Sequence, residues 1–181
     1  AMRIIDGSHK KRQIILPSKI DISPTTDFAK EALFNILRYY TDFQGIDVLD
    51  IFSGSGNISY EFASRGANKI IAIEKNDFWY NFIQNNIEKI NLKSISVFQL
   101  DAFYYIQHCK EKFDIIFADP PYNLDNIDKI PDLIFDNNLL NDDGVLILEH
   151  GSKLSFSDHK RLIDHRSVSY THMTLPTIYS V

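Results

Sequence analysis

Short apolar runs alternate with amphipathic segments between residues 46 and 151. The runs and the segments of helical spacing follow one another at 46–52, 58–66, 69–75, 77–90, 94–101, 102–110, 113–122, 128–139 and 144–151. Strands that alternate with helices in this way form a parallel sheet covered by helices on both faces. The pattern therefore predicts an α/β fold, a doubly wound, mostly parallel, Rossmann-like sheet. In such a sheet the ligand site lies outside the carboxyl ends of the strands.

The chain before residue 46 has a different pattern. Two short apolar runs flank the basic segment His9–Arg12, which predicts a hairpin or an extended arm over residues 1–22. The rest, 23–181, is expected to be one globular domain. Its end, 167–181, does not continue the pattern clearly, and the sequence leaves open a diverged strand or a non-native tail.

Helical spacing also predicts which side chains face the core. A helix is expected to begin at Ser23-Pro24, because serine caps helices and proline suits their first turn. Its inward face is predicted to carry Phe28, Ala32, Leu33, Ile36 and Leu37. The helix over 77–90 is predicted to turn inward Phe78, Phe82, Ile83, Ile87 and Ile90.

The composition excludes several classes of protein. Apolar residues make up 44% of the 181 residues and charged residues 24%, which is ordinary for a globular domain. No apolar run approaches the ~20 residues of a membrane span, and the first residues lack a signal peptide's apolar stretch. A single cysteine, Cys109, makes neither an internal disulfide nor a multi-cysteine metal site, and the histidines show no metal-ligand spacing. We expect a cytoplasmic protein without metal, and a monomer.

Charge is distributed unevenly along the chain. The net charge is −5, yet residues 1–40 hold seven Lys and Arg against four Asp and Glu, which leaves +3 there and −8 elsewhere. A basic arm on an acidic body favours a polyanionic partner such as RNA. The candidate contacts to its phosphates are Arg3, Lys10, Lys11 and Arg12.

A glycine loop follows the first predicted strand of the sheet. Asp50 ends that strand and leads into Phe52, Ser53, Gly54 and Gly56. Glycines let the backbone turn sharply and approach a ligand closely, although many such loops are only turns. Asp50 is a carboxylate at the end of an apolar strand, where it needs a partner.

Two further acids follow the next strands. Glu74, after the second strand, is placed to accept both hydroxyls of a ribose, or else is a solvated strand end. The loop lacks the third glycine of a dinucleotide fingerprint, whereas S-adenosylmethionine needs no pyrophosphate cradle. Asp101 and the adjoining Ala102, after the third strand, are then candidates for the adenine. Asp101 also fits the N-cap of the helix that follows, and both roles are compatible.

The most specific signal is Asp119-Pro120-Pro121-Tyr122, after the fourth strand. Two prolines remove two backbone donors and stiffen the chain, so that the Pro120 carbonyl is held outward. With the Asp119 carboxylate it offers two acceptors to a planar NH2 group, and Tyr122 offers a ring for stacking. The plain alternative is a rigid turn that ends the strand.

These motifs carry a family resemblance. VLDIFSGSG, the acid of IEKN, and DPPY resemble motifs of class I methyltransferases that act on amines. The N-terminal part, MRIIDGSHKKRQIILP and SPTTDFAKEALFNIL, is similar to the bacterial small-subunit ribosomal RNA methyltransferase D family, over residues 2 to about 166. The family usually has arginine where Ser23 and Phe28 stand, and its Arg-Gly-Arg segment is Lys11-Arg12-Gln13 here.

The resemblance implies methyl transfer from S-adenosylmethionine to the exocyclic N2 amine of a guanine in small-subunit (16S) ribosomal RNA, in a subunit or an assembly intermediate. Asp119 to Tyr122 would hold the amine, and the glycine loop with Asp50, Glu74 and Asp101 the cofactor. The alternatives are a DNA adenine-N6 or protein glutamine-N5 methyltransferase, and a non-catalytic RNA-binding assembly factor that retains the cofactor pocket. A nicotinamide oxidoreductase is more distant.

Overall fold

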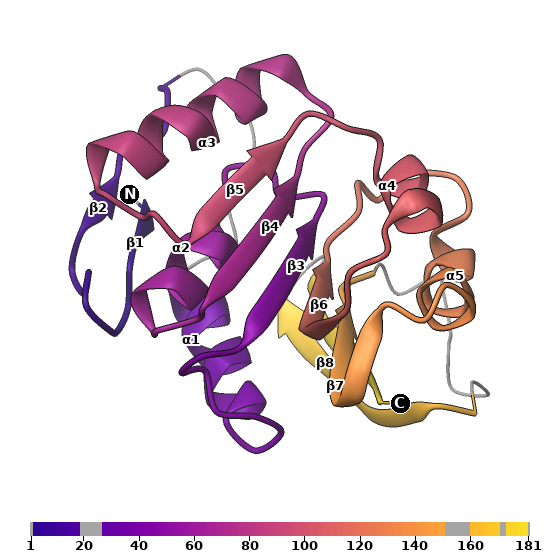
Figure 1. The fold of residues 1–181 in the computed structure, drawn as a ribbon. Helices are drawn as coiled ribbons and strands as arrows, with labels where there is room; N and C mark the ends of the chain where they lie inside the picture. Colours follow the sequence, from indigo (N-terminus) through magenta and orange to yellow (C-terminus); the bar gives the residue numbers. More distant parts are fainter. Residues whose placement is uncertain (1, 19–26, 151–159, 171–172, 181) are drawn as a thin grey trace.

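A computed structural model describes residues 2–18, 27–150, 160–170 and 173–180, and it confirms the α/β sheet. Seven strands lie in the order β5-β4-β3-β6-β7-β9-β8 (Figure 1). The first five of these are parallel to one another, and β9 and β8 add an antiparallel hairpin to β7. The strands are β3 (Asp47–Ile51), β4 (Lys69–Ile73), β5 (Ile95–Phe98), β6 (Phe113–Ala118), β7 (Leu140–Leu148), β8 (Leu162–Tyr170) and β9 (Met173–Ser180).

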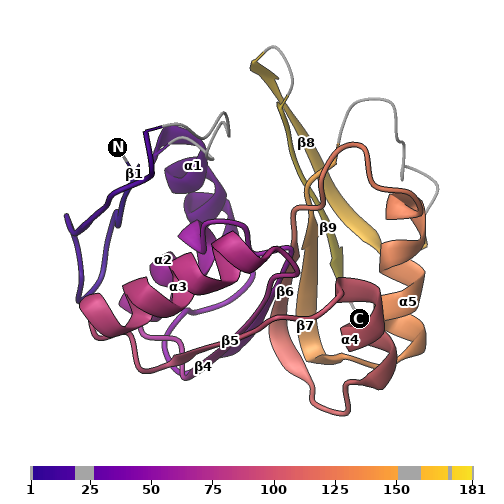
Figure 2. The ribbon, with the colours of Figure 1, turned by 90° about the horizontal axis from the view of Figure 1, so that it is seen from above.

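Helices cover both faces of this sheet, as predicted for a doubly wound fold. One face carries α1 (Asp27–Leu37), α2 (Asn57–Ser64) and α3 (Asp77–Lys89), and the other carries α4 (Ala102–His108) and α5 (Ile130–Asp136) (Figure 2). A short 3-10 helix, Ile127–Lys129, leads into α5. Alternate strand residues feed two separate cores, Val48 on the side of α1 to α3 and Leu49 on the other. This is the period-2 alternation of a sheet buried on both faces.

The N-terminal arm is a small hairpin that is held firmly on α2. Strands β1 (Met2–Arg3) and β2 (Gln13–Ile14) pair antiparallel, which confirms the predicted hairpin. Glu61 of α2 accepts the backbone N–H groups of Ile5 at 2.8 Å and of Asp6 at 3.1 Å. The arm thus joins the main core and extends the domain's surface beside α2.

The predicted inward faces of α1 and α3 are each wrong at their first residue, Phe28 and Phe78. Phe28 is 70% exposed, because the buried stripe of α1 runs through Lys30, Leu33, Phe34 and Leu37 and leaves Phe28 on the far side. Hydropathy cannot place a lysine inward, yet the Lys30 ammonium is fully buried against the Glu61 carboxylate at 3.1 Å. In α3 the inward residue of the first turn is Trp79, and Phe78 is 47% exposed.

Two further sequence predictions concern the start of the first helix and the C-terminal segment 167–181. The start of the first helix at Ser23-Pro24 lies outside the described residues. The segment 167–181 is not a structureless tail over its described part: residues 167–170 belong to β8, and 173–180 form β9. Pairing of Ile147 with Ile178 places β9 directly beside the last parallel strand. The described part of this segment thus forms strands of the sheet.

Candidate active site

The sheet brings the two principal motifs side by side. Strands β3 and β6 are neighbours, with Ile51 opposite Ala118, and β4 flanks β3 on its other side, with Ile73 opposite Ile51. The residues that follow these strands therefore leave the same edge of the sheet. The glycine loop, Glu74 and Asp119 lie there, as the prediction for a doubly wound sheet requires.

The glycine loop has the backbone freedom that a closely approaching ligand needs. Gly54 and Gly56 both have positive φ angles, 56° and 83°. A Cβ atom at Gly56 would lie 2.7 Å from the Tyr60 ring, so this glycine is required by packing inside the protein. A Cβ at Gly54 would meet nothing within 4 Å. The space in front of Gly54 is therefore open to a ligand rather than filled by protein.

Asp50 is a buried acid, and among the described residues no cation pairs with it. It is 1% exposed, and its Oδ2 accepts the Ser59 hydroxyl at 2.6 Å. Burial raises the pKa of Asp50 to about 7; the Ser59 hydrogen bond opposes this, and the charges of Asp119 and Glu74 add to it. Such a site is deficient in positive charge. A ligand that carries an ammonium and a sulfonium group supplies what it lacks.

The acid on the second strand lies against the glycine loop. One carboxylate oxygen of Glu74 accepts the Gly54 N–H at 2.9 Å, and the other accepts the Asn76 N–H at 3.2 Å. Each oxygen keeps a further lone pair, so the carboxylate can also accept ligand hydroxyls. The loop's Ser53 is fixed by its hydroxyl, which donates to the Asp50 carbonyl at 2.7 Å. Phe52 has a φ angle of 60° and lies edge-on to Phe103.

The candidates for the adenine lie at the start of α4. Asp101 is the N-cap of α4, where its side chain accepts the Tyr104 N–H at 3.1 Å. The capping alternative is thus correct, and the exposed carboxylate retains acceptor capacity for an amine. Ala102 is the first residue of α4 and is buried. Its contact with an adenine stays a prediction.

The Asp-Pro-Pro-Tyr segment begins as soon as β6 ends at Ala118. Within the described chain, no backbone N–H donates to the Pro120 carbonyl, whereas the Pro121 carbonyl accepts the Leu124 N–H at 2.9 Å. The Tyr122 side chain is 93% exposed, with its ring free to stack on a ligand. The roles of Asp119 and the Pro120 carbonyl as acceptors, and of the Tyr122 ring as a stacking surface, stay predictions.

Glu149 is a residue of this site that the sequence analysis missed. It follows β7, which pairs with β6 so that Ala118 lies opposite Leu148, and the Glu149 N–H donates to the Ala118 carbonyl at 2.9 Å. Its carboxyl is hydrogen-bonded to that of Asp119. An acid at the carboxyl end of a strand, in LILEHG, is the signal that would have found it.

The carboxyls of Asp119 and Glu149 are both desolvated and are hydrogen-bonded to each other. Asp119 as a whole residue is exposed to solvent, whereas the surroundings of its carboxyl group are partly desolvated by neighbouring protein atoms. Burial raises the pKa of Asp119 to about 6, while the hydrogen bond from Glu149 lowers it. Burial, together with the charge of Asp119, raises the pKa of Glu149 well above its usual range. The hydrogen bond between the two carboxyls needs a proton, and the directions of the two pKa shifts favour that proton on Glu149 and the negative charge on Asp119.

The predicted RNA contacts lie on the exposed side of the hairpin. Arg3 pairs with Asp27 at 3.1 Å, and Lys10 pairs with Asp6 at 3.8 Å. Arg3, Lys10 and Lys11 line one hollow, whereas Arg12 does not. Among the described residues, no group of acids, histidines and cysteine could hold a metal ion. No helix in the same ranges has the length and apolar character to cross a membrane.

The fold, together with the open glycine loop and the Asp-Pro-Pro-Tyr turn beside it, defines a class I methyltransferase. The chain belongs to the family described as "Conserved hypothetical protein 95", whose model matches residues 2–179. It is 30% identical over 161 residues to the Bacillus subtilis protein named "Putative rRNA methyltransferase YlbH", which covers 87% of this chain and 86% of the relative.

Two further proteins support the assignment. "Ribosomal RNA small subunit methyltransferase D" of Escherichia coli K12 is 29% identical over 149 residues, which are 82% of this chain and 74% of that protein. The solved structure titled "Putative methyltransferase yhhF from Escherichia coli" superposes with a TM-score of 0.86 at 24% identity, over 99% of this chain and 97% of the other. That structure shows the fold, including the arm and the C-terminal strands.

Proposed function

We propose that this protein transfers the methyl group of S-adenosylmethionine to the exocyclic N2 amine of a guanine in 16S ribosomal RNA. The observation that carries the proposal is the juxtaposition of Asp119 and the Pro120 carbonyl with the open space over Gly54. The enzyme acts in the cytoplasm as a monomer, on a small subunit or an assembly intermediate. The relatives named as ribosomal RNA methyltransferases support this substrate.

The residues around the glycine loop fit the cofactor. When bound, S-adenosylmethionine supplies an activated methyl group on a sulfonium, so that the reaction needs no metal. Asp50 and the loop amides would hold the aminocarboxylate end, and Glu74 the ribose hydroxyls. Asp101 would accept the adenine amine. The fit is electrostatic as well as steric, because the buried Asp50 carboxylate gains a cationic neighbour.

The amine site is built to activate a weak nucleophile. The lone pair of an exocyclic amine is delocalised into the base, and hydrogen bonds from both of its protons favour a pyramidal nitrogen. Asp119 and the Pro120 carbonyl would accept those two hydrogen bonds and so orient the nitrogen for methyl transfer. After transfer, Asp119 receives the proton directly or through a water molecule. Glu149 keeps the Asp119 carboxylate oriented through their shared proton.

The target base must leave its stack to reach this site. Tyr122, exposed at the rim, supplies a ring on which the extruded base stacks and so offsets part of the unstacking cost. Lys10, Lys11 and Arg12 on the hairpin contact phosphates and position the RNA. Base contacts would then come only from the amine site and its rim.

The deciding experiment is labelling with tritiated S-adenosylmethionine. Naked 16S ribosomal RNA, small subunits, DNA and total protein are offered as separate acceptors, and the labelled base is mapped. Label on guanine N2 of the small-subunit RNA is expected. Label confined to DNA or protein, or no transfer to any acceptor despite cofactor binding, would overturn the proposal in favour of its alternatives.

Variants of Asp119 test the chemical step. Asp119→Ala should lower the single-turnover rate by on the order of 10² to 10⁴ with cofactor binding retained, because a positioned acceptor for the amine is lost. Asp119→Asn keeps a carbonyl acceptor and should retain more activity than alanine. A near-wild-type rate in Asp119→Ala would mean that the segment is only a rigid turn.

A further inference from the structure

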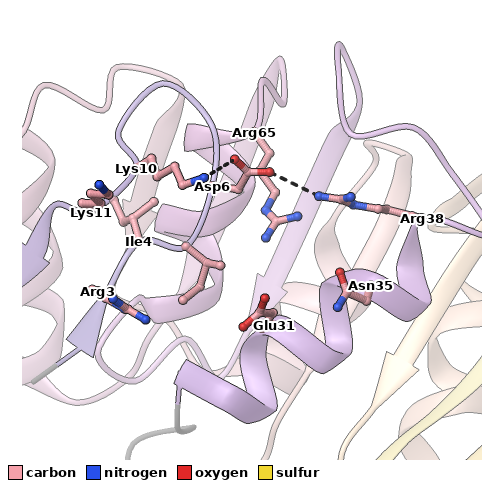
Figure 3. Close-up of a pocket in the computed structure, with 10 residues that line it drawn as sticks. Arg3, Ile4, Asp6, Lys10, Lys11, Glu31, Asn35, Arg38 and Arg65 are labelled. Atoms are coloured by element: carbon pink, nitrogen blue, oxygen red, sulfur yellow. Dashed lines mark hydrogen bonds and ion pairs between the residues drawn. The ribbon is translucent and has the colours of Figure 1, made fainter.

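A basic hollow lies between the N-terminal hairpin, α1 and the end of α2, apart from the amine site (Figure 3). Its volume is about 340 Å³. The charged side chains that line it are Arg3, Lys10, Lys11, Arg38 and Arg65, against only Asp6 and Glu31. Five cations and two acids from three separate elements make the hollow strongly attractive to an anion.

Arg65 is the unusual member of this group. Its side chain is 5% exposed, and its Nε donates to the Glu61 carboxylate at 2.9 Å. The guanidinium packs over the Phe34 ring, 4.6 Å from the ring centroid. One terminal nitrogen, Nη1, is buried and has no hydrogen-bond partner among the described residues. An unsatisfied buried donor on a charged group is costly, so a missing acceptor is expected.

Asp6 occupies the middle of the cations. Its carboxylate is 3.2 Å from Arg38 and 3.8 Å from Lys10. The Gly7 backbone hydrogen bond and the charges of Lys10, Arg65 and Arg38 hold the pKa of Asp6 below its usual value. Figure 3 shows this carboxylate between Lys10 and Arg38, where it acts as an internal anion for these two cations. The Asp6 side chain is 45% exposed.

We propose that this hollow is a phosphate-binding site, in which a backbone phosphate of the substrate RNA takes the place of the Asp6 carboxylate between Lys10 and Arg38. A phosphate brings more acceptor oxygens than a carboxylate and can satisfy Arg65 as well. This inference rests on the proposed function for the identity of the polyanion. The ligand chemistry itself follows from the cations and the orphan donor.

A phosphate bound in the hollow would fix the position of the RNA relative to the amine site. Helix α2 begins beside the glycine loop and ends at Ser64, just before Arg65, and its 8 residues span about 12 Å. The hairpin that supplies Lys10 is tied to α2, since Ser8 and His9 donate their backbone N–H groups to Ser64. Phosphate contacts fix the register without reading sequence. A rigid second contact at this distance would orient the extruded nucleotide.

Two substitutions with opposite effects test the site. Arg38→Gln removes a cation and should lower RNA affinity, with the log–log salt slope reduced by about 0.7 to 0.9. Asp6→Asn removes the internal competitor and should raise RNA affinity several-fold at low salt. Both side chains are about half exposed, so the fold should be retained. Lys112→Gln, an exposed lysine just before β6 that does not line the hollow, is the matched control and should change neither quantity.

The double variant separates displacement from simple charge. If phosphate replaces the carboxylate between Lys10 and Arg38, the gain from Asp6→Asn should shrink when Arg38 is already glutamine. An equal gain in both backgrounds would overturn the site, as would a wild-type salt slope in Arg38→Gln. Inorganic phosphate should shift the Arg65 side-chain NMR signals in the free protein. Their failure to move, together with an unchanged RNA slope, would also overturn it.

These outcomes are distinct from failure of the proposed function. If small-subunit RNA is bound and methylated but the variants behave like wild type, only the hollow is wrongly assigned. If no RNA is methylated while inorganic phosphate shifts Arg65 and the variants change polyanion binding, the phosphate site stands and the RNA substrate does not.

Discussion

Because the Asp50 carboxylate is buried, we expect Asp50→Asn to raise the stability of the protein and to weaken its binding of the cofactor. Asp50 is 1% exposed, and burial raises its pKa to about 7. In the unfolded chain the same group ionises near pH 4. Between about pH 4 and pH 7, Asp50 is therefore protonated in the folded protein and ionised in the unfolded chain. Stability from this group is therefore complete below about pH 4 and is lost as the pH rises to about 7.

The size of the loss follows from the two pKa values. A rise from 3.8 to about 7 corresponds to a cost of up to roughly 4 kcal/mol above pH 7. Asparagine has a similar shape and carries no charge, and its carbonyl can still accept the Ser59 hydroxyl, which lies 2.6 Å from the aspartate. Asp50→Asn should hence be more stable than wild type at pH 8, and similar to it at low pH.

Cofactor binding should change in the opposite direction. A bound ammonium or sulfonium favours the ionised form of Asp50, so the wild type should release a proton on binding S-adenosylmethionine between about pH 5 and 7. Affinity should rise with pH through that range. The variant lacks the charge, and it should bind more weakly at pH 8 without releasing this proton.

Two measurements check this reasoning. Urea unfolding from pH 4.5 to 8.5 gives the difference in the free energy of unfolding between variant and wild type. Calorimetry in buffers of different ionisation enthalpy counts protons released on binding. A stability difference that stays constant with pH, or equal proton release by both proteins, would refute the assignment of a proton to Asp50.

The remaining predictions concern the other parts of the site and the hairpin. Glu149→Gln should shift the acidic limb of the pH–rate profile, since the Asp119 carboxylate loses its proton-sharing neighbour; a purely structural role would lower activity at every pH alike. Gly54→Val should weaken cofactor binding at least tenfold, about 1.4 kcal/mol, whereas Gly45→Val is the control, with a positive φ and open space of its own; equal calorimetric affinities would contradict this. Alanine at all of Lys10–Arg12 should flatten the salt dependence of RNA binding and spare cofactor binding, as filter binding across salt concentrations would show.

Much of the active site was open to prediction because its motifs are local. Glycines, prolines and acids that follow apolar runs must leave a parallel sheet at its carboxyl edge, whatever the order of the strands. Asp50, Gly54, Glu74 and Asp119 were found in this way, and the structure places them at that edge. Their contacts with cofactor and base stay predictions.

Other features depended on partners that are distant in sequence. Phe28 was assigned to the core because the burial of Lys30 is invisible to hydropathy. That burial depends on Glu61, a residue of another helix, which neutralises the ammonium inside the protein. Glu149 was missed because only the pairing of β6 with β7 brings it beside Asp119. Tertiary packing thus decides which face of a helix is buried and which groups lie next to a carboxyl.

The sequence by itself determined the alternation of strands and helices, the edge of the sheet that carries the chemistry, and the residue types found there. These follow from the periodicity of side chains along the backbone and from the conformational limits of glycine and proline, which act over a few residues. Only the tertiary structure decided that the carboxyl of Glu149 lies beside that of Asp119, and that Arg65 lies buried in a basic hollow with a donor that no described residue satisfies. Burial and charge depend on the distances between side chains in space, which the order of residues along the chain does not state.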